Sequence, residues 1–191
     1  EFLIMSTEAV DRRIRRTRKQ LRECLVTLLK QKKVQDITVR ELTELAGISR
    51  GTFYFHYADI YALMDQMEAA QLARLNDLMD SLIPSISQED APPALVALFT
   101  YMTENPELCA ALYGKSWESE FTHNAKKLVA ERCLGEFAPD GGTEEQKYML
   151  AFAVNGCFGT IVAWQEAGFQ PPAAEIARIT WQAIRAVKGR M

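Results

Sequence analysis

Apolar residues along this chain recur at helical spacing and not at strand spacing. Leu21, Leu25 and Leu28 follow one another at intervals of four and three residues within an amphipathic pattern over residues 8–32. A second long pattern of this kind covers residues 59–82. Since no segment shows the convincing alternation of a strand, the hydrophobic pattern predicts helices throughout.

Capping and stop residues divide the region between these patterns into two short helices. Thr38 and Glu41 have the spacing of a capping box, in which each side chain bonds the backbone N–H of the other residue. Gly47 is suited to the left-handed stop after this helix, and Ser49 caps the helix that follows. The two short helices predicted in this way cover residues 38–46 and 50–57.

Proline- and glycine-containing segments separate the remaining helices. Residues 84–93 read as a polar, proline-rich loop, and residues 138–142 and 168–172 as breakers. Thr143 and Gln146 repeat the capping-box spacing at the start of a long uncharged helix. The later helices are predicted over residues 94–103, 106–113, 116–136, 143–167 and 173–188. The sequence therefore predicts an all-α protein of about nine helices, with a helix-turn-helix head on a helical-bundle body.

Charge is distributed unevenly between the two parts of the chain. Residues 1–57 contain 12 lysines and arginines against 7 acidic residues, whereas the remainder contains 10 against 18. A basic head on an acidic body favours a polyanionic partner for the head. We therefore expect a polyanion-binding domain over residues 5–57, and the resemblance described below implies a dimerisation and regulatory domain over residues 58–191. Residues 1–4 precede Met5 and are interpreted as a remnant of expression.

Cysteine and histidine usage argues against a metal site and against an enzyme. The four cysteines lie far apart without a Cys-x-x-Cys pair, and the chain has only two histidines. No serine, cysteine or carboxylate constellation for nucleophilic or acid–base catalysis is visible. We expect reduced thiols, no cofactor, no signal peptide and a cytoplasmic protein. The uncharged residues 148–165 read as a core or interface helix and not as a membrane span.

The segment GISRGTFYFHY, residues 47–57, carries more aromatic residues than one buried face can use. Phe53 and Tyr57 share one helical face, which we expect to pack in the head, so the other side chains are left for DNA. Arg50, at the N-terminal end of a recognition helix, can donate two hydrogen bonds to guanine. The predicted DNA-binding residues are Arg12, Arg13, Arg15, Thr38, Arg40, Ser49, Arg50, Gly51, Thr52, Tyr54, Phe55 and His56.

The stretch ITVRELTELAGISRGTFYFHYADIYALM, residues 37–64, resembles the N-terminal signature of the TetR family of bacterial transcriptional regulators. The capped helix, the Ala-Gly-Ile-Ser turn and the histidine followed by an aromatic residue carry the resemblance. It implies a homodimer that reads a palindromic double-stranded DNA operator and has a ligand pocket in its C-terminal body. The chain departs from many members at Ile60, where they carry a phosphate-binding lysine.

The resemblance also implies that the last two long helices form the dimer interface. Glycines on the uncharged helix would let two copies approach closely, and the predicted interface residues are Phe152, Gly156, Gly159, Val162 and Trp164. The candidates for the pocket of an unknown small-molecule effector are Phe99, Tyr101, Met102, Tyr113, Trp117, Phe121, Phe152 and Asn155. A ligand-responsive repressor is the leading interpretation. An activator or co-activator whose body binds a protein is the alternative.

Overall fold

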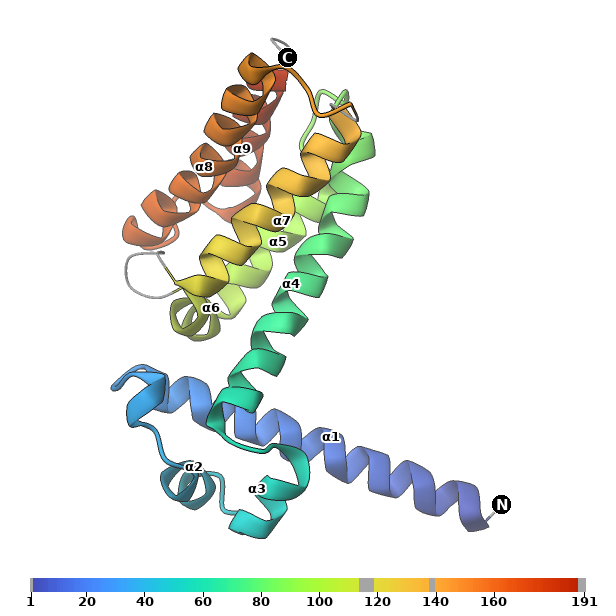
Figure 1. Cartoon of the computed structure of the whole chain (residues 1–191), viewed down its shortest axis with the longest axis vertical. Coiled ribbons are helices and arrows are strands. Elements are labelled where there is room, and N and C mark those ends of the chain that lie inside the picture. Colours follow the sequence, from blue (N-terminus) through green and yellow to red (C-terminus); the bar gives the residue numbers. More distant parts are fainter. Residues whose placement is uncertain (1, 114–118, 138–139, 189–191) are drawn as a thin grey trace. The chain divides into compact units, whose positions relative to one another are not determined.

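The computed structural model, which describes residues 2–113, 119–137 and 140–188, is helical in every regular element of those ranges (Figure 1). The elements of the N-terminal part are α1 (Phe2–Leu29), the 3-10 helix η1 (Val34–Asp36), α2 (Val39–Leu45), α3 (Arg50–His56) and α4 (Ile60–Ser85). Those that follow are α5 (Pro93–Glu104), α6 (Pro106–Tyr113), α7 (Glu120–Phe137), α8 (Glu144–Glu166) and α9 (Ala173–Lys188). The predicted all-α class is thus confirmed.

Local signals account for most of the helix boundaries. Thr143 Oγ1 accepts from Gln146 N, and Gln146 Oε1 accepts from Thr143 N, so the predicted capping box of α8 is complete. At α2 only half of the box forms. Thr38 Oγ1 accepts from Glu41 N at 3.2 Å, but the Glu41 carboxylate instead pairs with Lys32 at 2.7 Å.

Two predictions about the helix boundaries were wrong. Pro84 lies inside α4, so the loop that was predicted to start at this residue begins later. Pro84 has no N–H to donate to the carbonyl four residues earlier, and the helix ends one residue later, at Ser85. The second error concerns α1, which begins at Phe2 and so extends further toward the N-terminus than the predicted helix.

The chain divides into two compact units, Glu1–Ala69 and Ala70–Met191, which we call the head and the body. The boundary falls inside α4, later than the position after Tyr57 that the sequence favours. In the head, α1 packs on α2 and α2 packs on α3. Leu21, Leu25 and Phe53 are completely buried and form the centre of the core of the head.

The body is a bundle in which α5 packs on α9, α7 on α8 and α8 on α9. Two tryptophans lie in its core, each with its ring nitrogen satisfied. Trp164 Nε1 donates to the carbonyl of Pro171 at 2.6 Å, and Trp181 Nε1 donates to the carbonyl of Gln88 at 3.2 Å. None of the helices in the described ranges combines the length and apolar character needed to span a bilayer.

Candidate functional site

The turn between α2 and α3 is set by backbone geometry and caps. Gly47 has φ of +62°, in the left-handed region that favours glycine. Its N–H bonds the carbonyl of Glu44 at 3.2 Å, and the N–H of Ile48 bonds the carbonyl of Thr43 at 3.0 Å. This is a Schellman stop, which satisfies the last carbonyls of α2 and turns the chain toward α3. Ser49 Oγ then accepts from Thr52 N at 3.0 Å and starts α3.

Helix α3 has one face in the core of the head and one face in solvent, as the sequence predicts. Phe53 is fully buried, and its ring lies 5.9 Å from that of Tyr57, whose hydroxyl donates to Gln66 Oε1 at 2.6 Å. By contrast, Tyr54 is 57% exposed and Phe55 is 75% exposed. Two large aromatic side chains in water, on a helix of only seven residues, indicate a surface that is completed by a partner.

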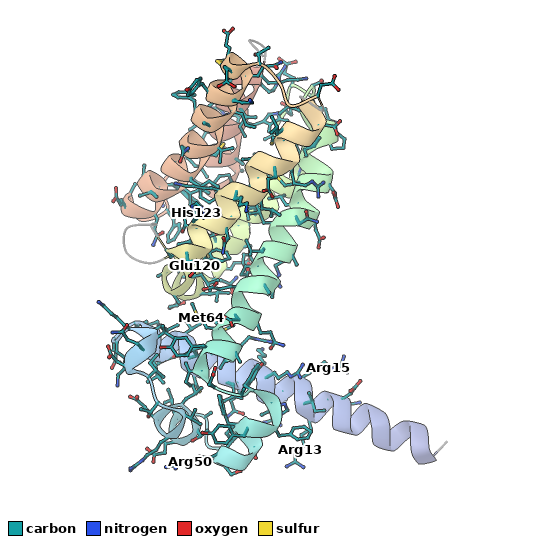
Figure 2. The ribbon with its side chains drawn as sticks, viewed as in Figure 1. Arg13, Arg15, Arg50, Met64, Glu120 and His123 are labelled. Atoms are coloured by element: carbon teal, nitrogen blue, oxygen red, sulfur yellow. The ribbon has the colours of Figure 1, made fainter. Side chains whose placement is uncertain are left out.

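Basic side chains surround this exposed face unevenly. Figure 2 shows Arg13 and Arg50 on the same side of the head, whereas Arg15 points away from the other side of α1. Two residues along an α-helix correspond to a rotation of about 200°, so Arg13 and Arg15 cannot share a face. Arg16, which is exposed and lies three residues after Arg13, is on the Arg13 side instead. The sequence places this basic run within the first predicted helix, but the predicted DNA-binding set does not include Arg16.

Arg18 is a second basic residue that the sequence-based set missed. Its Nε atom is buried and, among the described residues, has no hydrogen-bond partner. Burial lowers the pKa of His56, and the nearby positive charge of Arg18 lowers it further. His56 is therefore neutral at neutral pH and can donate one ring N–H.

Three further predicted DNA-binding residues, Arg40, Thr38 and Gly51, are exposed on the surface of the head. Arg40 Nε already bonds Glu44 Oε1 at 2.8 Å in an exposed pair, which leaves its terminal nitrogens available. Thr38 is exposed, and its oxygen caps α2. A Cβ atom added at Gly51 would lie 3.7 Å from Ser49 Oγ, an ordinary contact, so packing within the head does not require a glycine there. Ile60, in contrast, is buried and belongs to the core of the head.

The body contains a cavity of about 500 Å³ between α4, α5, α6, α7, α8 and α9. Its lining includes four of the predicted pocket residues, Phe99, Tyr101, Met102 and Tyr113. Three others do not line this cavity: Phe121 packs against Tyr113, and Phe152 and Asn155 are exposed on α8. Trp117 lies outside the described residues.

The outer face of α8 carries unusually exposed apolar residues. Tyr148 is 73% exposed and Phe152 is 71% exposed, and a Cβ atom added at Gly156 or Gly159 would meet nothing within 4 Å. Val162 is partly buried. Trp164, the last of the predicted interface residues, does not lie on this face.

Trp164 is only 2% exposed. Its ring packs edge-on against Phe99 and Phe169, so it belongs to the core of its own chain and not to an outer face.

In the part of the chain that the structure describes, no group of three histidine, cysteine or acidic residues is placed to hold a metal ion.

Comparison with known proteins relates the chain to transcriptional regulators. The model of the TetR-type transcriptional regulator C-terminal region matches residues 89–186, just over half of the chain. A 48-residue segment is 38% identical to an uncharacterized HTH-type transcriptional regulator, YxbF, of Bacillus subtilis strain 168. That segment covers 25% of this chain and only 13% of YxbF.

Several solved structures share the fold at low sequence identity. The fatty acid degradation regulator FadR from Bacillus halodurans superposes with a TM-score of 0.60 at 13% identity, covering 88% of this chain and 94% of FadR. A TetR-family regulator from Streptomyces coelicolor gives 0.58 at 19% identity, with 92% and 82% covered. SmeT, the repressor of a Stenotrophomonas maltophilia multidrug efflux pump, gives 0.58 at 16% identity, with 91% and 89% covered.

Proposed function

Because the chain belongs to the TetR family of transcriptional regulators, we propose that it is a repressor that binds an operator palindrome as a homodimer and releases it when a small molecule enters the body. The family consists of regulators and not of enzymes, in keeping with the sequence. We place the protein in the cytoplasm, where its DNA target lies.

The observation that carries this proposal is the exposed face of α3. An N-terminal Arg50, the aromatic residues Tyr54 and Phe55, and the neighbouring Arg13 offer three kinds of contact to a duplex. Arg50 suits the guanine edge in the major groove, whereas Arg13 suits a phosphate. Phe55 suits a thymine methyl group, because its ring has no polar atom to satisfy.

The exposed face of α8 supports the dimer. Tyr148 and Phe152 are large apolar side chains left in water by the single chain, and the open space at Gly159 would allow a second helix to approach closely. Two recognition helices related by twofold symmetry would read half-sites about 34–36 Å apart, which corresponds to one turn of DNA.

The body cavity favours a small-molecule effector over the alternative of a protein-binding activator. A protein partner would require an exposed docking surface, whereas this cavity lies among the helices of the bundle. FadR and SmeT, by their names, regulate fatty acid degradation and an efflux pump, two settings in which small molecules are handled.

Selection of duplexes from a random pool by the full chain tests the proposal. We expect an inverted repeat with two half-sites spaced by about one helical turn. Arg50→Ala should relax the base preference at one position in each half-site, at a cost of about 1–3 kcal/mol there. Recovery of unrelated sequences without a shared repeat would contradict the proposed function.

A further inference from the structure

The cavity of the body is long as well as large. Its wall on α4 extends from Gln71 to Ile83, a distance of about 18 Å at about 1.5 Å per residue, and Ile86 continues it beyond the end of the helix. Lys188, which lines the cavity from α9, donates to Ser87 just beyond Ile86, so this lysine marks the far end. Tyr101 and Tyr113 line the end that is nearer to Gln71. The volume of about 500 Å³ is typical of sites for small organic molecules.

The wall of the cavity is predominantly aliphatic. Its lining includes Leu75, Leu78, Leu82, Ile83, Leu98 and Ile161. The charged residues that border it are Arg74, Asp77 and Lys188, each at least partly exposed to solvent. An aliphatic ligand can therefore fill most of the length without desolvating a charged group of the protein.

Three cysteines also line the cavity without adding charge. Burial raises the pKa values of Cys109, Cys133 and Cys157 to about 11 each. At neutral pH these thiols are protonated, and a buried thiol behaves as a small apolar group. The interior therefore offers no full charge to a ligand.

Arg74 provides a cation at the end of the cavity near Tyr101. Its guanidinium carbon lies 4.7 Å from the centre of the Tyr101 ring, which holds the side chain over that end. Within the described ranges no carboxylate forms an ion pair with Arg74. Lys188 differs from Arg74 because it already bonds Ser87 at 3.2 Å. One end of the cavity therefore presents an arginine that has no anionic partner among the described residues.

We propose that the effector is a long-chain aliphatic carboxylate, with its hydrocarbon chain in the cavity and its carboxylate paired with Arg74. This inference rests on the proposed function, because it names the ligand of the same regulator. A bare hydrocarbon fits less well, since it would leave Arg74 unpaired.

A planar aromatic compound also fits less well. The ring of Phe99 already packs edge-on against Trp164 at 5.2 Å, and the guanidinium of Arg74 lies over the Tyr101 ring. The elongated shape and the aliphatic wall favour a flexible chain instead.

Calorimetric titration of the full chain, without DNA, tests whether the hydrocarbon chain of the ligand lies in the cavity. The ligands are decanoate, dodecanoate, tetradecanoate and hexadecanoate. Each added methylene should tighten binding about fourfold, until the chain fills the cavity and the gain stops. Affinity that does not depend on chain length, or no binding of any member of the series, would overturn the proposal.

The same titration, with variants of the protein and with tetradecanol as a ligand, tests the pairing of the carboxylate with Arg74. Arg74→Gln should weaken tetradecanoate binding by about tenfold or more, because a charge-assisted hydrogen bond is lost, and should leave tetradecanol binding unchanged. Lys127→Gln, which removes an exposed cation of α7 outside the cavity lining, is the matched control and should not weaken tetradecanoate binding. Equal weakening of the acid and the alcohol by Arg74→Gln would overturn the assignment of the carboxylate.

Separate titration of the selected duplex distinguishes the two proposals. If the chain binds the duplex but none of the carboxylates, the inference about the effector fails and the DNA-binding function stands. If the carboxylates bind with the expected length dependence but the chain binds no duplex, the proposed function fails and the ligand site stands. Both proposals predict that tetradecanoate weakens duplex binding.

Discussion

The head and the body place their aromatic side chains in opposite ways. In the head, the short helix α3 buries Phe53 but leaves Phe55 75% exposed. In the body, Trp164 and Trp181 are almost completely buried, and the aliphatic cavity lies among the same helices. The head therefore exposes the side chains that we propose bind its partner, whereas the body encloses a cavity in which a ligand could bind. In the head, the exposure of side chains identifies the candidate binding surface. In the body, the cavity identifies the candidate binding site.

The largest effect expected separates the two phenylalanines of α3. Phe53→Ala should destabilise the head by about 3–5 kcal/mol, because a fully buried ring is lost. Phe55→Ala, the matched control on the exposed face, should leave the denaturation curve unchanged and weaken duplex binding. Urea denaturation followed by circular dichroism measures the first effect. Similar loss of stability in both variants would contradict the assignment of the two faces.

The next effect concerns the outer face of α8. Gly159→Glu places a carboxylate in the proposed dimer interface, and an unpaired buried charge should weaken the dimer by about 3 kcal/mol or more. Gly135→Glu, at an exposed position of α7 where an added Cβ atom also meets nothing within 4 Å, is the matched control. Sedimentation equilibrium should find a monomer only for Gly159→Glu. A dimer of unchanged affinity would show that the interface lies elsewhere.

A smaller effect compares one N-cap in each unit. Ser49 caps α3 in the head and Thr143 caps α8 in the body, and alanine at either position should cost about 1 kcal/mol of stability. Only Ser49→Ala should also reduce affinity for the duplex, because α3 carries the recognition surface. Thermal unfolding and duplex titration of both variants check this. Equal losses of DNA affinity would contradict the division between head and body.

The smallest effect is a pH dependence at His56. Burial and Arg18 lower its pKa in the folded head, so the folded state prefers neutral histidine. This contribution to stability is present above the unfolded pKa of about 6.5 and is lost as pH falls through the lower folded pKa. A phosphate beside His56 would instead favour the charged form, so duplex binding should raise the pKa. NMR titration of the His56 ring with and without the duplex measures the change, and an unchanged pKa would exclude a phosphate at this position.

The head was largely predictable because its signals are local. The capping position of Thr38, the stop at Gly47 and the cap at Ser49 each act within a few residues, and the structure has all three. The missed features depend on contacts across the fold. The Glu41 carboxylate pairs with Lys32, nine residues away, instead of completing the capping box. The residues around Thr38 do not predict this contact.

The body was less predictable because α8 is apolar around most of its circumference. Periodicity could not tell which side would face the core, so Trp164 was assigned to the interface and Phe152 was assigned to both the interface and the pocket. The structure buries Trp164 and leaves Phe152 71% exposed. Which face a uniformly apolar helix buries is decided by its neighbours, here α7 and α9, and not by its own sequence.

The salt dependence of duplex affinity tests most directly whether the head is a DNA-binding surface. The logarithm of the binding constant should fall with the logarithm of salt concentration by about 0.9 for each phosphate contact. Replacing Arg13 and Arg16 with alanine should flatten this slope by about one to two units. Arg15→Ala, on the other side of α1, should change it by less than about one unit. An unaltered slope in the double variant would contradict the account, because these arginines would then be solvated surface and not part of a DNA interface.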